Sequence, residues 1–252
     1  MDGSAVLVGS KSDYDAGAGS SEKFIARTAG ADGNNLYVVV VDKGPDFTIT
    51  TASAHGLSVG GTYTDDSAVG HEVVEVVSTT QVRIIQGTAA PTPAAGDTSA
   101  AFTNSQWNAT AIGSTGLTYK EIGPRPGTSA FASERYVSYD EMHVAVVDTS
   151  TNTVVERMTY LSKISDAKST EGNSIYWKDY VNQFSGYIYA SALTSAEFTT
   201  LGEDPGGAVA SYGATAGAPI KIARILKTAG GALSGGTDDY ACLLYTSDAA
   251  DE

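Results

Sequence analysis

The sequence predicts an α+β fold with a β-rich body and a small inserted β-barrel or β-sandwich module at residues 46–87. Glycine makes up 28 of the 252 residues, and charged residues only 17%. The charged fraction is typically about 25%, so this composition suits strands and loops better than a helical bundle. Short runs of β-branched residues also recur along the chain between Gly, Pro and Asn, a pattern typical of strands joined by turns.

The first strong strand is predicted at residues 36–41, LYVVVV, where apolar residues leave no polar face. Residues 33–35, Gly-Asn-Asn, supply turn chemistry before it, since Gly and Asn tolerate positive φ. Residues 42–45, Asp-Lys-Gly-Pro, end it. We therefore expect residues 1–45 to begin the main domain.

A compact β module is predicted at residues 46–87. Phe47 and Ile49 alternate with threonines in the first strand, and two more strands are expected at 72–77 and 81–85. The link between the last two is short enough for a hairpin. Residues 88–130 are small, polar and rich in Pro and Gly, which predicts a linker followed by irregular chain.

The main domain is expected to continue over residues 131–241. A strand is predicted at 142–147, MHVAVV. The next run, 154–162, fits helical spacing and strand composition, and strand is favoured without excluding helix. A short helix over 175–184 is expected with Asn173 or Ser174 as its N-cap, then a strand within 185–190. Residues 202–219 are predicted to be a Gly/Ala-rich loop, and a further strand falls within 220–229.

The net charge of −14 makes direct binding to nucleic acid or to an anionic membrane surface unexpected. A single cysteine, Cys242, excludes an internal disulfide framework. No run approaches 18 apolar residues, so no membrane insertion is expected. The first residues lack the basic and long apolar regions of a secretory signal, which favours synthesis in a cytoplasm.

No catalytic, cofactor-binding or metal site is predicted, and the protein is not expected to be an enzyme. His55, His71 and His143 have no ligand partner at helical i+4 spacing, as a zinc site on a helix would need. His143 is expected to be a half-buried strand residue. Phosphate-binding glycine motifs and the nucleophile elbow of hydrolases are missing. The remaining candidate ligands are acidic pairs that lack a calcium-loop pattern: Asp13 with Asp15, and Asp238 with Asp239.

A dense group of aromatic residues leaves three interpretations open. It is most simply the core where the short helix packs on the following strand, but a subunit interface or a sugar-stacking platform would have the same composition. An exposed aromatic row near Trp107 or Trp177 would favour the last of these. The group comprises Tyr176, Trp177, Tyr180, Phe184, Tyr187 and Tyr189.

Three stretches resemble the contractile-tail sheath proteins of large tailed bacteriophages (myovirus type). They are GADGNNLYVVVVD at 30–42, the block from DEMHVAVVD to SGYIYA at 140–190, and LSGGTDD at 233–239. The 140–190 block is the most specific of the three. Residues 46–120 match no family pattern and occupy a place where the family carries variable insertions.

The resemblance implies a structural subunit of the virion tail, assembled in the host cytoplasm. Its partners would be other sheath subunits in a helical array and the tail tube protein, and contraction would drive that tube through the host envelope for genome ejection. The alternative is a carbohydrate-binding or adhesive β module. Residues 242–252, CLLYTSDAADE, look like translated sequencing-adapter read-through. We therefore expect a truncated fragment that does not assemble into a tube alone.

Overall fold

The body of the protein is a four-stranded antiparallel sheet with strand order β10-β9-β2-β13. The computed structural model describes residues 24–27, 31–42, 44–112, 115–190, 215–216, 220–221 and 229–232. The strands of this sheet are β2 (Leu36–Asp42), β9 (Glu141–Asp148), β10 (Thr153–Ser162) and β13 (Ala229–Ala232).

Both faces of the body sheet are buried along its central strands, β2 and β9. Val38 and Val40 on β2 belong to one apolar cluster with Val144 of β9, while Val39 and Val41 belong to a second. Successive side chains of a strand point to opposite faces. The unbroken apolar run of β2 is therefore the pattern of a sheet that is covered on both sides.

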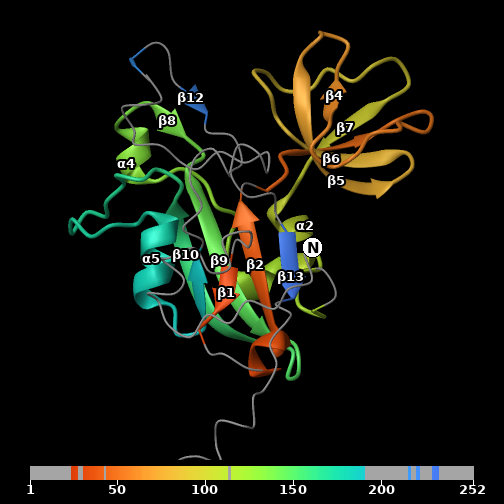
Figure 1. Cartoon of the computed structure of the whole chain (residues 1–252). Helices are drawn as coiled ribbons and strands as arrows, with labels where there is room; N and C mark the ends of the chain where they lie inside the picture. The colour runs from red at the N-terminus through yellow and green to blue at the C-terminus, as the bar shows by residue number, and fades with distance from the viewer. Residues whose placement is uncertain are drawn as a thin grey trace, which may run out of the picture.

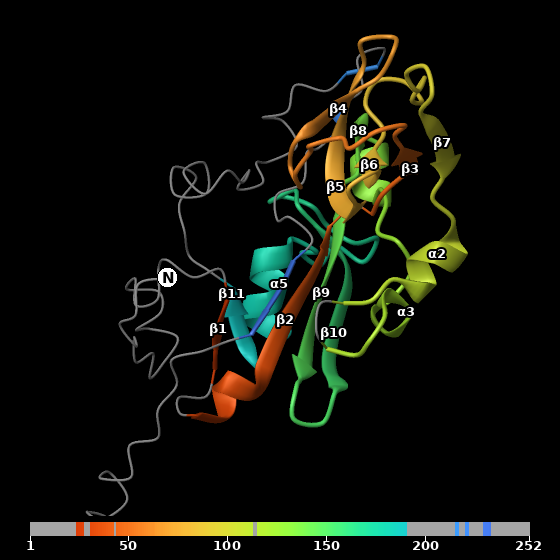
Figure 2. The same cartoon turned by 90° about the vertical axis from the view of Figure 1, so that its right-hand side faces the viewer.

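Different elements cover the two faces (Figure 2). On one side lie α5 (Trp177–Phe184) and the paired strands β1 (Phe24–Ala26) and β11 (Ile188–Ala190), with Trp177 completely buried. On the other side lie α2 (Asn104–Ala109) and α3 (Tyr119–Ile122), which contribute Trp107 and Ile122. The body is thus a three-layer arrangement around the sheet.

The inserted segment forms a separate five-stranded antiparallel sheet with order β4-β5-β6-β3-β7 (Figure 1). It has its own apolar cluster, which includes Ile49, Val73 and Ile84. We call it the inserted sheet. Its strands are β3 (Phe47–Thr50), β4 (Thr62–Thr64), β5 (Gly70–Ser78), β6 (Gln81–Ile85) and β7 (Thr98–Ala101).

Short elements complete the described chain. The 3₁₀ turn η1 (Ala31–Asn35) precedes β2, and helix α4 (Ala130–Ser133) leads into β8 (Val137–Ser138). Strand β8 pairs in parallel with β12 (Ile220–Lys221). Ala132 and Val137 pack with Ile164 in a small fourth cluster.

The prediction of a β-rich fold is confirmed, and the structure adds that three of its sheets are antiparallel and that its helices are few and short. The strands expected at 36–41, 72–77, 81–85 and 142–147 all form. The ambiguous run at 154–162 is strand β10, because its residues pair with β9 along the body sheet. Among the described residues the inserted sheet does not close into a barrel, since its edge strands β4 and β7 do not pair with each other.

Two predicted segments are corrected. The irregular chain expected at 88–130 contains β7, α2 and α3, so the inserted sheet extends past residue 87 to Ala101. The helix expected from Asn173 or Ser174 begins instead at Trp177, and Tyr176 is an N-cap without a side-chain bond. Isolated bridges of Ser174 with Lys168 and of Tyr176 with Ser162 hold this stretch extended. Most of the loop predicted at 202–219 lies outside the described residues.

Candidate functional site: the joint between the inserted sheet and the body

The chain crosses between the body and the inserted sheet at two places that are hydrogen-bonded to each other. It enters through Pro45 and Asp46 and leaves through Phe102. The Phe102 amide donates to the Asp46 carbonyl at 2.8 Å, and the Asp46 amide donates to the Ile84 carbonyl at 2.8 Å. The Gln86 amide donates to Asp46 Oδ2 at 2.8 Å. Asp46 therefore ties the entering strand to the leaving one.

Arg125 holds both crossing segments. Its Nη1 donates to the Phe102 carbonyl at 3.2 Å, its Nη2 donates to the Pro45 carbonyl, and Nη2 lies 3.5 Å from Asp46 Oδ1. Burial lowers the pKa of Arg125, and the charge of Asp46 opposes that shift. Pro124 and Pro126 flank the arginine and restrict its backbone. We call this arrangement the Arg125 clamp.

Trp107 fills the space beneath the clamp. It is 3% exposed, stacks on Tyr119 with ring centroids 4.4 Å apart, and donates from Nε1 to the Gly123 carbonyl at 3.1 Å. Helix α2 presents it through a capping box at Thr103. Gly44 permits this approach, because a Cβ there would lie 2.7 Å from Trp107 Cζ3.

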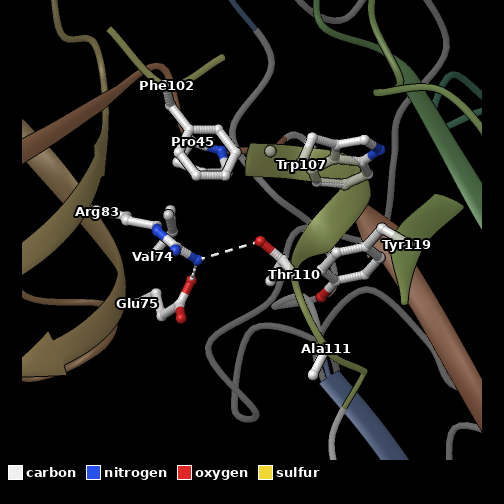
Figure 3. A pocket seen from close by; sticks show the side chains of 10 residues that line it. Pro45, Val74, Glu75, Arg83, Phe102, Trp107, Thr110, Ala111 and Tyr119 are labelled. Carbon is white, nitrogen blue, oxygen red and sulfur yellow. Dashed lines mark hydrogen bonds and ion pairs between the residues drawn. The ribbon is translucent and has the colours of Figure 1, made fainter. Parts of the chain in front are cut away.

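Arg83 reaches from the inserted sheet to the body across a cavity of about 130 Å³ (Figure 3). Its Nη1 donates to Glu75 Oε2 at 2.5 Å and to Thr110 Oγ1 at 3.3 Å, and its guanidinium lies 4.8 Å from the centre of the Phe102 ring. Its Nε is buried without a hydrogen-bond partner among the described residues. The cavity is large enough to admit water, which can accept a hydrogen bond from this donor.

A second hollow, of about 400 Å³, lies on the other side of Trp107. Its lining combines polar and cationic side chains with the apolar surfaces of Trp107 and Pro124. It includes Asn104, Asn108, Lys120 and Arg125. The joint therefore combines a buried aromatic wedge, two arginines and two hollows, which suits orientation of the inserted sheet rather than acid–base chemistry.

None of the three candidate histidines has the surroundings of a metal ligand. His55 lies in a turn, where its Nε2 contacts the Ser78 carbonyl at 2.8 Å and its Nδ1 accepts from the Leu57 amide at 2.8 Å. Both ring nitrogens are thus used locally. Within the described residues there is no group of three or more His, Cys, Asp and Glu that could hold a metal ion.

His71 and Asp65 form a buried pair inside the inserted sheet, with both side chains fully buried and 3.3 Å between Nε2 and Oδ2. His71 Nδ1 accepts from the Gly87 amide at 3.0 Å, so Nε2 carries the proton donated to Asp65. The pKa of Asp65 is lowered to about 2, first by the hydrogen bond from the Thr92 amide and further by those from the Val69 amide and His71. The pair therefore connects the turn after β4 to the segment that follows β6.

His143 is more deeply buried than expected. The sequence predicted a half-buried residue, but its exposed fraction is 0%. Its Nε2 is 2.7 Å from the Pro124 carbonyl and its Nδ1 accepts from the Tyr160 amide at 3.0 Å. Burial lowers its pKa. The ring thus links β9 to the Arg125 loop and to a bulge of β10, where Tyr160 has a φ of +58°.

The predicted aromatic group divides between interior and surface. Trp177 is 0% exposed and lies in the body core, as the core interpretation expects. Phe184 is 56% exposed and Tyr187 is 41% exposed. Tyr189 lies under Arg27, 4.2 Å from guanidinium carbon to ring centre. No single interpretation therefore fits all six aromatic residues.

Two buried polar clusters had no signal in the sequence. Lys163 Nζ lies 2.6 Å from Asp42 Oδ1, with both side chains fully buried. Asp140 accepts from the Ser129 amide at 2.8 Å, from Ser129 Oγ at 2.7 Å and from Ser162 Oγ at 2.5 Å. Both clusters lie where β2 and β10 end and β9 begins, and they fix the chain there.

The remaining candidates, Cys242, Asp13, Asp15, Asp238 and Asp239, lie outside the described residues. No helix in the described part of the chain is long and apolar enough to cross a membrane. No protein-family model matches the sequence, and no curated protein matches it either.

Proposed function

We propose that this chain is part of the sheath subunit of a contractile bacteriophage tail, a structural and mechanical protein. The observation that carries the proposal is where the resembling stretches lie. The stretch at 30–42 supplies η1 and β2, and the block at 140–190 supplies β9, β10, α5 and β11. Strands β2, β9 and β10 are neighbours in one sheet. Two stretches that resemble one family are therefore adjacent in space.

The inserted sheet agrees with the same proposal. It occupies the interval in which sheath proteins carry variable insertions, and it is joined to the body only through the two crossing segments along the chain. On this proposal it is a variable insertion into the sheath core domain, which comprises residues 1–45 and 131–241. On this proposal the module projects from the subunit while the body makes the lattice contacts.

A sheath subunit acts through force and contact rather than through a reaction. Closely packed interiors have low compressibility and transmit strain. The central strands of the body sheet are buried on both faces, and the Arg125 clamp fixes the inserted sheet to the body. In this function the subunit moves as a stiff unit while its contacts with neighbouring subunits and with the tail tube change.

A carbohydrate-binding or adhesive module is the second candidate, favoured by the exposed rings of Phe184 and Tyr187. Trp107 and Trp177 are 3% and 0% exposed, so neither offers a face on which a sugar could stack. A glycan-array screen of the chain tests this candidate directly.

The first test of the sheath proposal is to read the gene past both ends of this sequence. We expect a following α/β domain and a neighbouring tail-tube gene. An open reading frame that ends at Glu252 beside a signal-peptide or glycan-handling gene would remove the sheath proposal and favour the binding module.

A further inference from the structure

His143 lies between the body sheet and the Arg125 loop, residues 123–127. Its side chain is completely buried. Nε2 is 2.7 Å from the Pro124 carbonyl, and Nδ1 is 3.0 Å from the Tyr160 amide nitrogen. An amide N–H only donates and a carbonyl only accepts, so Nδ1 carries no proton and Nε2 carries one. The buried ring is therefore neutral, and its two nitrogens connect β9 to the loop and to β10.

The bond to Tyr160 supports a strained bulge of β10. The pairing of β10 with β9 shifts register between Met158 and Leu161, and Tyr160 within this bulge has a φ of +58°. Bulky residues rarely adopt a positive φ, and such conformations persist only where the surroundings hold them. The His143 ring provides that support through Nδ1 and through an edge contact with the Tyr160 ring, with ring centroids 5.0 Å apart.

A second proton on the His143 ring would have no acceptor. A charged imidazole donates from both nitrogens, so its Nδ1–H would face the N–H of Tyr160. In the described part of the chain no carboxylate is hydrogen-bonded or ion-paired to the ring, and an unpaired buried charge is very costly. Burial accordingly lowers the pKa of His143 below its ordinary value of about 6.5. The ring therefore takes up the proton where water reaches it.

The charged groups on the neighbouring elements do not compensate a charge on the ring. Arg125 is occupied at the clamp, and Arg157 donates to a backbone carbonyl of α3. Glu141 accepts from the Gly127 amide at 2.9 Å, and burial raises its pKa, so falling pH favours the buried, neutral form of Glu141. The titratable groups on the elements around the ring are Asp42 on β2, Glu141 on β9, Arg157 and Tyr160 on β10, Tyr119, Lys120 and Glu121 on α3, and Arg125 in the loop.

We propose that His143 is an acid-sensitive latch of the joint, which releases the Arg125 loop from the body when its ring binds a second proton. The loop is the weaker of the two covers of the ring. Strand β10 is paired with β9 on both sides of the bulge. The loop meets the ring through the Pro124 carbonyl and the backbone of Gly123, where an added Cβ would lie 3.6 Å from Nε2.

Release of the loop also loosens the clamp. Pro124 directly precedes Arg125, so a loop that lifts from the ring withdraws the guanidinium from the carbonyls of the two crossing segments. Acid then frees the inserted sheet to reorient while the body sheet stays folded. This regulation goes beyond the proposed sheath function and does not depend on it.

The direction of the effect follows from the pKa of His143 in the two states of the joint. The value is depressed while the ring is buried and about 6.5 once the ring is in water. The stability that the neutral ring gives the closed joint is thus complete above about pH 6.5 and is lost as the pH falls toward the depressed value. In that interval the equilibrium constant for opening rises by up to about tenfold per pH unit.

Hydrogen exchange at a series of pH values tests the latch, read as protection factors so that the intrinsic effect of pH on exchange is removed. We expect the protection of Phe102, whose amide bonds the Asp46 carbonyl, to fall by up to about 25-fold between about pH 7 and about pH 5. The Tyr160 amide should lose protection with it. Amides of β2 inside the body sheet should keep theirs.

The decisive variant is His143→Gln. Glutamine retains one donor for the Pro124 carbonyl and one acceptor for the Tyr160 amide, but it does not titrate, so the pH dependence at Phe102 should disappear. The matched control is His55→Gln, which removes a histidine from a turn of the inserted sheet and should leave the dependence unchanged. If His143→Gln does not fold, NMR titration of the His143 ring in the unsubstituted chain decides: the ring must gain its proton over the pH range in which Phe102 loses protection.

Four results would overturn the inference. They are unchanged protection of Phe102 down to about pH 5, a pH dependence that persists in His143→Gln, ring titration over a different pH range from the loss at Phe102, and equal loss in peptides of β5. The last result would assign the acid response to His71, the buried histidine of the inserted sheet. None of the four bears on the sheath proposal, which is tested by the neighbouring genes.

Discussion

Replacing Arg125 with methionine should loosen the inserted sheet while leaving the body intact. The substitution removes the donors to the Phe102 and Pro45 carbonyls and the contact with Asp46. Methionine keeps much of the aliphatic packing. The lost free energy therefore comes mainly from hydrogen bonds made by a charged, half-buried group.

The magnitude follows from those contacts. A hydrogen bond to a charged group contributes about 1.5–3 kcal/mol. The bond to the Phe102 carbonyl is long at 3.2 Å, and the Asp46 contact is longer at 3.5 Å. We therefore assign each hydrogen bond to the two carbonyls a free energy near the lower end of this range, and we assign the contact with the partly exposed Asp46 carboxylate only a small contribution. The expected loss is about 2–4 kcal/mol at the joint.

Hydrogen exchange followed by mass spectrometry measures this loss where it occurs. The amides of Asp46 and Phe102 lie in the two crossing segments, where they bond the Ile84 and Asp46 carbonyls at the base of the inserted sheet. If they exchange by opening of the joint, a loss of 2–4 kcal/mol accelerates them by about 30- to 900-fold. Peptides from β9 should change little. Arg135→Met is the control, because its contact with Glu134 is exposed and should contribute less than about 1 kcal/mol.

Unchanged exchange at Asp46 and Phe102 would refute the clamp. Equal acceleration in β9 would also refute it, since the inserted sheet and the body would then open as one unit rather than at the joint.

Three further changes probe other parts of the fold. Gly44→Ala should destabilise the chain to urea by about 1–3 kcal/mol through overpacking of the indole, whereas Gly186→Ala, with open space around its Cβ position, should not. Asp65 has a folded pKa of about 2, below the ordinary value of about 3.9. The stability it contributes is thus complete above about pH 4 and is lost as the pH falls toward 2, and Asp65→Asn should flatten that loss in acid-unfolding curves. Lys163→Met should cost about 3–5 kcal/mol in urea unfolding by removing the cation that the buried Asp42 carboxylate contacts, and adding Asp42→Leu should recover most of it. No recovery would show that the charge pair is not the cause.

The body strands could be predicted because their local pattern and their burial agree. LYVVVV and MHVAVV carry apolar residues on both faces, and the structure buries both faces. Strand β7, TSAA, is exposed along its whole length. It joins the sheet as an edge through backbone hydrogen bonds to β3, so no hydrophobic alternation marks it.

The N-termini of helices α2 and α3 are marked in the sequence by capping-box motifs, although the composition around them is typical of loops. Thr103 with Gln106 and Thr118 with Glu121 form capping boxes, a pattern readable as Thr-x-x-Gln and Thr-x-x-Glu. The Gly and Pro residues around them favoured irregular chain instead. Each helix buries a single residue, so neither is long enough to show an amphipathic pattern in the sequence.

The joint itself could not be predicted from local pattern. Arg125 is about 80 positions from Pro45 along the chain, and periodicity within a window carries no information on such contacts. Gly44, where the chain leaves β2, is the one local sign of the joint, but the reason for a glycine there is the close approach of Trp107, a contact over about 60 positions that local pattern does not carry.

Electron microscopy of the complete gene product, co-expressed with the neighbouring tail-tube protein, tests the sheath proposal most directly. We expect helical tubes of uniform diameter around the tail tube, with the inserted sheet as a projection from each subunit. Dispersed single molecules that do not bind the tail tube but do bind a glycan would contradict the proposal and would favour the carbohydrate-binding module.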